Sequence, residues 1–195
     1  MNKNIIKKNL SYHSKLLNIQ KNEMILKIEK FSKIIIDAIN NNKKILIAGN
    51  GGSAADAQHF ATELTVKMKK IRGALPLISL CTDTSALTAI GNDFNFNEIF
   101  SRQIEALGNK DDIFIPISTS GNSKNIIRGL NIAKKKKLIC LGILGNKGGK
   151  SKKITDENFI VKSSDPSRIQ EIHIIFYQNL CEVIENHFFK LKKKI

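Results

Sequence analysis

Five short apolar runs, separated by segments of helical character, constrain the fold of this chain more than any other feature. Apolar strands that alternate with helices predict βαβ units, and therefore a parallel sheet covered by helices on both faces. We expect an α/β fold, a three-layer sandwich with a five-stranded parallel sheet. The runs occupy residues 44–48, 75–81, 113–117, 138–144 and 159–161, and the helical segments occupy residues 53–68, 85–90, 96–107, 123–136 and a final stretch from Ser167.

The first 42 residues carry a helical pattern of their own. Apolar residues from Met24 to Ile39 recur at i, i+3 and i+4, which is typical of an amphipathic helix, and a separate helix is expected from Ile5 to Gln20. No repeat, Pro-rich linker or composition break divides the chain. We therefore expect residues 1–195 to form a single domain, with residues 1–42 as a helical extension that packs on it.

The net charge of +15 raises the possibility of a nucleic-acid partner. The cations, however, are 28 Lys and only 4 Arg, although Arg makes the bidentate contacts to guanine and phosphate. Lys134–Lys137 and Lys192–Lys194 lie at predicted helix C-termini, where cations favour the helix dipole. Because aromatic residues do not interleave with them, no base-stacking platform is visible. We expect a solvated basic surface and no nucleic-acid partner.

The sequence also predicts the cellular compartment. No apolar run approaches the roughly 20 residues of a membrane-spanning helix, and the first ten residues contain no apolar block. Cys81, Cys140 and Cys181 lie far apart and form no CxxC pair, which argues against disulfides and a cysteine zinc site. We expect a cytoplasmic protein with no membrane contact.

A glycine-rich segment, residues 49–56, follows the first predicted strand. Right-handed crossovers place such loops at the carboxyl edge of the sheet, and a helix starting there offers free N–H groups to an anion. Gly49, Gly51 and Ala54 match the GxGxxA pattern of dinucleotide-binding dehydrogenases. That class needs an acidic residue about 20 positions further on. Asp83, the first candidate, lies about 30 positions on, which leaves this alternative with the glycine loop alone.

The loop after the third strand is rich in hydroxyl groups. Ser118, Thr119, Ser120 and Ser123 surround Gly121 at the start of a predicted helix. A helix N-cap requires one Ser or Thr, not four. Hydroxyls and backbone N–H groups at a helix start form a cradle for the oxygens of a phosphate group, so we interpret this loop as a phosphate site.

Two further segments carry weaker signals. The polar turn 82–85, with Asn92 and Asp93 after the next helix, suits a polyhydroxyl substrate and ordinary capping equally well. His59 and Glu63 have i, i+4 spacing, so they share one helix face. Such a pair can bind zinc or supply a base, but it is also common as a plain surface pair.

The last helix contains Gln170 and His173 among apolar residues. Polar side chains inside an apolar helix need partners. From the residues alone, we interpret both as structural rather than as ligands.

Four segments in order, GNGGSAADAQHFATEL, TDTSALTAIGND, ISTSGNS and SRIQEIH, resemble the sugar isomerase (SIS) family and most closely its phosphoheptose isomerases. The resemblance covers nearly the whole chain. It implies a five-stranded parallel sheet flanked by helices, and a homotetramer with active sites between subunits and the long terminal helices in the contacts. The implied reaction is aldose–ketose isomerisation of D-sedoheptulose 7-phosphate to D-glycero-D-manno-heptose 7-phosphate, for lipopolysaccharide or capsule heptose.

The same resemblance implies a role for individual residues. His59, Glu63 and Gln170 fall on zinc-ligand positions, with one zinc ion per subunit, and Glu63 also falls on the catalytic base. Ser118, Thr119, Ser120 and Ser123 would hold the phosphate. The implied substrate contacts are Asn50, Gly51, Gly52, Ser53, Glu63, Asn92, Asp93, Ser118, Thr119, Ser120, Ser123 and Gln170.

The chain departs from the family pattern at one position. The family has a histidine eight residues after the glutamine of RIQE, where this chain has Gln178, and glutamine cannot shuttle protons. His173, five residues earlier, lies about 140° away around the helix. Two hypotheses follow: an isomerase, or a non-catalytic SIS protein that binds a sugar phosphate or a protein partner such as the replication initiator. The presence of His59 and Glu63 favours the isomerase.

Overall fold

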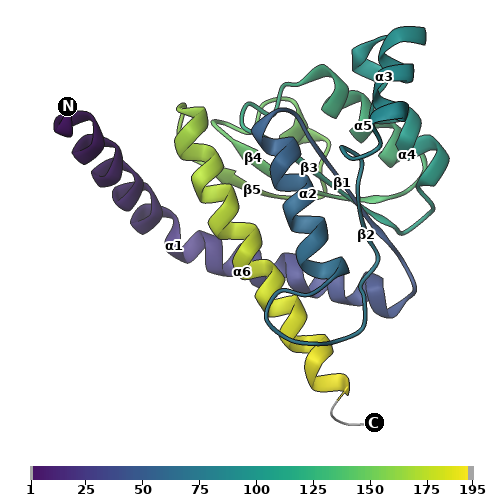
Figure 1. Cartoon of the computed structure of the whole chain (residues 1–195), viewed down its shortest axis with the longest axis horizontal. Coiled ribbons are helices and arrows are strands. Elements are labelled where there is room, and N and C mark those ends of the chain that lie inside the picture. Colours follow the sequence, from purple (N-terminus) through teal and green to yellow (C-terminus); the bar gives the residue numbers. More distant parts are fainter. Residues whose placement is uncertain (1, 193–195) are drawn as a thin grey trace.

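The computed structural model describes residues 2–192, with side chains up to Lys190, and is built around a parallel sheet (Figure 1). Neighbouring strands follow the order β2-β1-β3-β4-β5 and all pairs are parallel. This confirms the expected α/β sandwich. Lys193 and Lys194 of the second lysine run lie outside the described residues. The strands are β1 (Ile45–Gly49), β2 (Leu77–Ser79), β3 (Ile113–Ser118), β4 (Ile139–Gly145) and β5 (Glu157–Val161).

Helices cover both faces of the sheet, because alternate strand side chains point to opposite sides. Ile45 and Ile47 of β1 belong to the apolar cluster under α1, α2 and α6, whereas Leu46 and Ala48 belong to the cluster under α4 and α5. α3 has no buried residue and lies at the periphery. The helices are α1 (Lys3–Asn40), α2 (Gly52–Thr65), α3 (Thr84–Asp93), α4 (Ser101–Leu107), α5 (Lys124–Lys135) and α6 (Pro166–Lys192).

The N-terminal segment forms one continuous helix of 38 residues, where the sequence predicted two. The prediction had one helix from Ile5 to Gln20 and a second from Met24 to Ile39. In the structure Gln20 is fully buried. Its side chain donates to the carbonyl of Ile160 (2.9 Å) and accepts from the N–H of Lys162 (3.0 Å), so it joins α1 to the end of β5. The stripe is interrupted by a bonded polar residue, and the helix continues through it.

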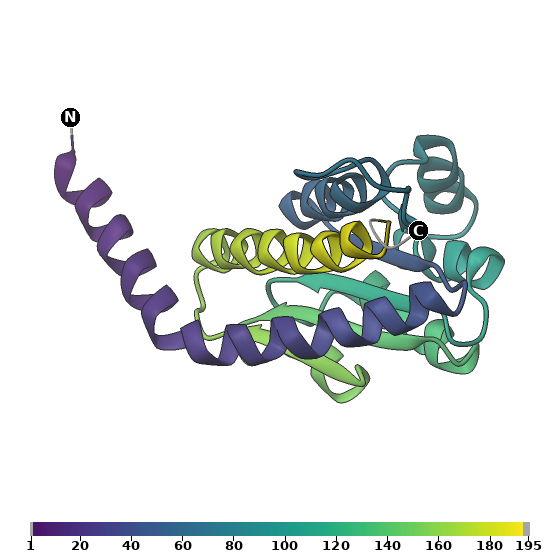
Figure 2. The same ribbon diagram turned by 90° about the horizontal axis from the view of Figure 1, so that it is seen from below.

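The first turns of α1 project away from the body of the molecule (Figure 2). Ile5, Ile6 and Leu10 are more than half exposed there, and Leu16 is the first buried residue of the helix. A stretch of helix with exposed apolar side chains and no underlying core is a surface suited to a protein contact.

Two smaller differences concern helix boundaries. The segment 96–107, predicted as one helix, is a short 3₁₀ turn (Phe96–Glu98) followed by α4. α3 extends to Asp93, so Asn92 and Asp93 lie in its last turn and not after it. A second 3₁₀ turn covers Ser151–Lys153. None of the described helices is long and apolar enough to cross a membrane.

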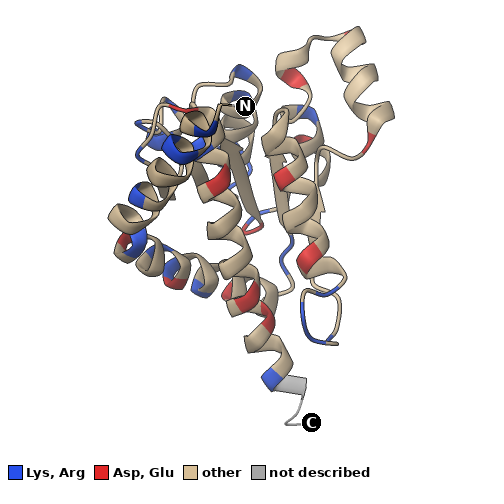
Figure 3. Cartoon of the chain, turned by 60° about the vertical axis from the view of Figure 1, so that its left-hand side comes forward, with Lys and Arg blue, Asp and Glu red and all other residues tan. Residues whose placement is uncertain are grey.

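Lys and Arg lie on several separate elements (Figure 3). Some of the described lysines have an acidic partner: Lys27 and Lys30 of α1 both contact Glu157 of β5, and Lys44 contacts the buried Asp112. The two lysines lower the pKa of Glu157 by hydrogen bonds that outweigh its partial burial. The pairs with Glu157 join α1 to the edge of the sheet.

Candidate active site

The loop between β1 and α2 brings backbone N–H groups to the carboxyl edge of the sheet. Gly51 has a φ of +56°, in the left-handed region that favours glycine, and the N–H of Ser53 closes the turn on the carbonyl of Asn50 (3.0 Å). α2 then begins at Gly52. A Cβ on Gly52 would overlap the amide of Gln170, so this glycine allows α6 to approach the start of α2.

The loop between β3 and α5 forms the opposite side of the same edge. Gly121 turns the chain with a φ of +63°. The hydroxyl of Ser118 accepts from the N–H of Gly121 (3.1 Å), and that of Ser120 accepts from the N–H of Asn122 (3.1 Å). Ser123 is the N-cap of α5, but its hydroxyl makes no capping bond. The residue in the ordinary capping position thus keeps its hydroxyl available.

A cavity of about 60 Å³ lies between these two loops. The first turns of α2 and α5 both begin beside it, so their free N–H groups and positive dipole ends favour an anion there. The cavity brings together five of the predicted contacts, one of which is the N-cap of α5. Its lining is Asn50, Ser53, Ile117, Ser118, Thr119 and Ser123. Ser120, predicted with them, is exposed and does not line it.

Asn125 fixes the two loops relative to each other, and the sequence patterns did not indicate it. Its side chain is buried and exchanges two hydrogen bonds with the side chain of Asn50, at 2.9 and 2.8 Å. The signal was present: an Asn on the buried face of an amphipathic helix, in its first turn, needs a polar partner. The pair therefore fixes the side chain of Asn50, which lines the cavity.

A second constellation lies further along α2, where it packs against α6. His59 Nε2 is 2.9 Å from Glu63 Oε1, and the amide nitrogen of Gln178 is 3.2 Å from each. The side chain of His59 is 51% exposed and that of Glu63 is 17% exposed. The predicted pair is therefore in contact, and the residue at the departing position faces both members. The three side chains converge at a surface that a ligand can reach.

Tyr177 and Asp56 lie behind His59. Tyr177 is fully buried, stacks on Phe60, and its hydroxyl is 3.0 Å from His59 Nδ1. Burial raises the pKa of Asp56 to about 6, although the charge of His59 and a hydrogen bond from Tyr177 act to lower it. Burial and the negative charge of Asp56 also raise the pKa of Tyr177 well above its usual range. The hydroxyl therefore stays protonated near neutral pH.

The two constellations are separated along α2. From Ser53 in the cavity to Glu63 is ten residues, a rise of about 15 Å. Gln170, predicted as a ligand beside His59 and Glu63, instead lies against Gly52 at the edge of the sheet. It is eight residues, about 12 Å, from Gln178 on the same helix. Within one chain Gln170 lies with the glycine loop and not with the His59–Glu63 pair.

Asn92 and Asp93 contact each other, through a 2.9 Å bond from the Asn92 amide. Both are exposed, and in the described part of the chain no hydrogen bond joins them to either loop.

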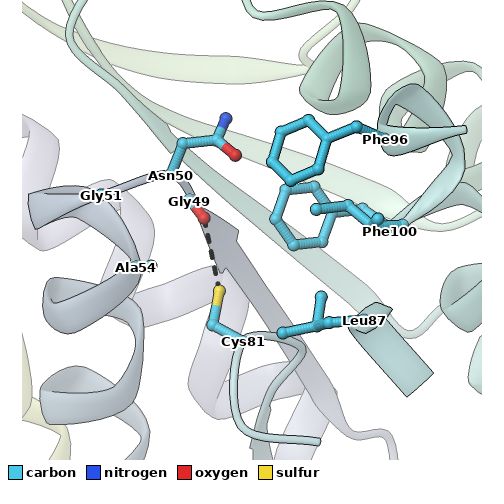
Figure 4. Close-up of a pocket in the computed structure, with 9 residues that line it drawn as sticks. Gly49, Asn50, Gly51, Ala54, Cys81, Leu87, Phe96 and Phe100 are labelled. Carbon is cyan, nitrogen blue, oxygen red and sulfur yellow. Dashed lines mark hydrogen bonds between the residues drawn. The ribbon is translucent and has the colours of Figure 1, made fainter. Parts of the chain in front are cut away.

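Near their helix the glycine loop borders a second, largely apolar cavity of about 160 Å³ (Figure 4). Cys81 donates from its thiol to the Gly49 carbonyl there, 3.4 Å away, and burial raises the pKa of that thiol. Phe96 and Phe100 form its other wall.

Comparison with known proteins agrees with this geometry. Residues 10–145 match the SIS domain family. The chain is 48% identical over 186 residues to phosphoheptose isomerase 1 of Campylobacter jejuni, an alignment that covers 95% of this chain and 99% of that protein. The chain belongs to the phosphoheptose isomerases of the SIS domain family.

Solved structures of phosphoheptose isomerases share the fold. The enzyme from Neisseria gonorrhoeae is 34% identical with a TM-score of 0.89, covering 95% of this chain and all of that one. The phosphoheptose isomerase from Francisella tularensis is 31% identical with a TM-score of 0.92, covering 95% and 99%. The five-stranded sheet and its flanking helices are thus those of the phosphoheptose isomerases.

The resemblance to phosphoheptose isomerases implies a zinc ion, and the donors around His59 fit one. An imidazole nitrogen and a carboxylate oxygen already face each other, and a half-turn of the Gln178 amide adds an oxygen. Three protein ligands and one open position are typical of catalytic zinc. No cluster of three His, Cys, Asp or Glu side chains occurs among residues 2–192, so such a site depends on the amide of Gln178.

Proposed function

We propose that this chain interconverts D-sedoheptulose 7-phosphate and D-glycero-D-manno-heptose 7-phosphate, as an aldose–ketose isomerase of bacterial heptose biosynthesis. The observation that carries the proposal is the polar cavity between the glycine loop and the Ser118–Ser123 loop. Hydroxyls and two helix starts in one small cavity favour the phosphate group of the substrate over an uncharged sugar. The expectation that zinc is the metal and that the product enters lipopolysaccharide or capsule heptose belongs to the same proposal.

Glu63 is the base that the geometry supports. Its carboxylate takes the proton from C1 of the ketose, and the C–H electron pair forms the C1–C2 double bond of an enediolate. Return of that proton to C2, with transfer of the hydroxyl proton from O1 to O2, completes the aldose. The His59 imidazole, 2.9 Å from the carboxylate, holds Glu63 in place.

The negative charge that develops on O2 requires a stabilising group. The amide of Gln178, 3.2 Å from Glu63 Oε1, can donate a hydrogen bond to such an oxygen, but it has no proton to transfer. His59, Glu63 and Gln178 would hold zinc, and a bound zinc ion supplies Lewis-acid stabilisation of that oxygen.

The proposed active site combines two copies of the chain. The rise of about 15 Å from Ser53 to Glu63 places the phosphate cavity and the base at opposite ends of α2, and the family resemblance implies active sites between subunits. We propose that one copy supplies the phosphate cavity and another supplies Glu63. The exposed apolar residues Ile5, Ile6 and Leu10 at the projecting end of α1 provide contact surface for such an assembly, which we propose to be a homotetramer.

Gln178 favours a second candidate function, a non-catalytic SIS protein that binds a sugar phosphate. The position where the family resemblance implies an acid–base histidine carries an amide, which supports binding but not proton transfer. The retained contact between His59 and Glu63 supports the isomerase over this alternative.

Turnover of D-sedoheptulose 7-phosphate by the purified protein tests the proposal, with and without added zinc, in deuterated water. Deuterium at C1 together with the aldose product supports the isomerase. Deuterium at C1 without product shows that Glu63 acts but the second proton step fails. Binding of the sugar phosphate with no exchange supports the non-catalytic alternative. Sedoheptulose without its phosphate is the matched control, and equal binding of both contradicts the phosphate site.

A further inference from the structure

Residues 146–151, which follow β4 and which we call the support loop, lie directly against the Ser118–Ser123 loop. A Cβ on Gly149 would lie only 2.6 Å from the carbonyl oxygens of Ser120 and Gly121. Gly149 also has a φ of +53°, in the left-handed region that favours glycine. Glycine therefore allows the two backbones to approach more closely than a residue with a side chain would.

The support loop ends in Gly149-Lys150-Ser151, as the phosphate-binding loops of nucleotide-binding proteins do. Its backbone N–H groups, however, are bonded to the neighbouring loop. The N–H of Lys150 donates to the side-chain oxygen of Asn122 (3.0 Å), and the N–H of Ser151 donates to the carbonyl of Gly121 (2.9 Å). A short 3₁₀ turn follows, where such a phosphate-binding loop would open an α-helix. The support loop thus holds the Ser118–Ser123 loop rather than a ligand of its own.

The contacts fix the direction of two successive peptide units. The carbonyl of Ser120 accepts from the side-chain amide of Asn122 (3.2 Å), and the N–H of Gly121 in the same unit donates to the hydroxyl of Ser118 (3.1 Å). In the next unit, the carbonyl of Gly121 accepts from Ser151, and the N–H of Asn122 donates to the Ser120 hydroxyl (3.1 Å). Because the C=O and N–H of a planar trans peptide point in opposite directions, the carbonyls face the support loop and the N–H groups face the hydroxyls.

This arrangement suits an anion in the adjoining cavity. Ser118 lines the cavity, and because its oxygen accepts from Gly121, its own proton is left to donate to a ligand. A carbonyl oxygen carries partial negative charge and opposes an anion, so an anion site needs its carbonyls directed elsewhere. Asn122 is exposed and is not among the six residues that line the cavity. Its effect on a ligand is therefore exerted through the peptide that it holds.

We infer that Asn122 is a positioning residue for the phosphate site: its side chain ties the Ser118–Ser123 loop to the support loop and keeps the carbonyl of Ser120 directed away from the cavity. The inference rests on the proposed function, because the cavity that it shapes is the proposed phosphate site.

Asn122→Ala tests the inference, because it removes both side-chain bonds at an exposed position. The affinity for D-sedoheptulose 7-phosphate, measured by calorimetry, should fall about tenfold, as expected for the net loss of one or two hydrogen bonds. The KM should rise by a similar factor, whereas kcat at saturating substrate should stay near the native value. Asn131→Ala is the matched control, since Asn131 is an exposed asparagine further along α5, and it should leave all three quantities unchanged.

An affinity in Asn122→Ala equal to that of native protein would overturn the inference. Equal losses in affinity and kcat, with a lower free energy of unfolding, would also overturn it, because general damage to the fold has that signature. Affinity requires no turnover, so a native chain that binds the sugar phosphate without isomerising it contradicts the isomerase and not the inference. A native chain that binds sedoheptulose as tightly as its phosphate contradicts the phosphate site and the inference together.

Discussion

The two ends of the α2 helix recognise ligands by different physical means. At its start, the cavity is made of backbone N–H groups, a left-handed glycine and hydroxyls. These come from two loops, the one after β1 and the one after β3. Two turns and more beyond, the site is made of side chains from two helices, His59 and Glu63 from α2 and Tyr177 and Gln178 from α6. The first end depends on the backbone path that aims its N–H groups as well as on its hydroxyls. The second depends on helix packing and on single functional groups.

The largest effect is expected at the side-chain end of α2, the site formed by His59, Glu63, Tyr177 and Gln178. Glu63→Gln removes the base and keeps the shape, so turnover of D-sedoheptulose 7-phosphate should fall by about 10³-fold with substrate binding preserved. Glu182→Gln is the control, because Glu182 lies on exposed α6 surface paired with Lys69. Steady-state kinetics and calorimetry measure the two quantities. A variant that keeps more than about a tenth of native turnover removes Glu63 from the base role.

The second effect concerns α6, the helix that carries Gln170 beside the cavity and Gln178 beside His59. His173 of α6 is fully buried, and its Nε2 donates to the carbonyl of Leu144 at the end of β4 (3.0 Å). Burial lowers its pKa from 6.5 to about 4. The unfolded chain therefore binds a proton between these values that the folded chain does not, and stability falls as pH falls from about 6.5 to 4. The contribution is about 3 kcal/mol.

Denaturant unfolding across that pH range checks this sign. His173→Asn should lose this part of the acid dependence, whatever its stability at neutral pH. His187→Asn, near the end of α6, should keep the native slope. Parallel curves for native protein and His173→Asn would show that His173 accepts a proton in the fold.

The third effect tests the backbone end. Gly121→Ala places a side chain at a φ of +63° and against the carbonyl of Gly148, so the loop must shift. The free energy of unfolding should fall by about 2 kcal/mol, and the KM for the sugar phosphate should rise about tenfold. Gly73→Ala is the control, since nothing lies near its Cβ. An unchanged KM in Gly121→Ala would detach this loop from phosphate binding.

The smallest effect is an expected rise in turnover when a proton-transferring group is placed beside His59 and Glu63. Gln178→His adds a group that transfers protons at neutral pH beside Glu63 and His59. The kcat should rise several-fold, by about 1 kcal/mol in activation free energy, if the second proton step limits the rate. Asn179→His, one residue on and exposed, provides the control for an added histidine. No gain in Gln178→His shows that another step limits turnover.

The backbone end could be predicted from the sequence because its signals are local. A glycine that needs a left-handed φ and four hydroxyls around a helix start are contiguous patterns, and the parallel sheet places them at one edge. The same reasoning found all five strands. It divided α1 into helices over 5–20 and 24–39, because the bonds of Gln20 to Ile160 and Lys162, which join this stretch to the end of β5, are long-range contacts.

The side-chain end could be predicted only in part. His59 and Glu63 share one helix, so their contact follows from i, i+4 spacing. Tyr177 lies 118 positions from His59, and in an apolar helix it looks like ordinary core. Which face of α6 meets α2, and at what height, is decided by packing of the whole domain. That packing also separates Gln170 from the His59–Glu63 pair.

The length of α2 has a genetic consequence. Because Ser53 and Glu63 lie about 15 Å apart on one rigid helix, a chain with a damaged cavity and a chain with a damaged base each retain the half that the other lacks. Mixed assemblies of Ser123→Ala and Glu63→Gln chains then contain some intact pairings. Two inactive alleles in one cell should complement each other, and co-refolded mixtures should recover activity that neither parent shows.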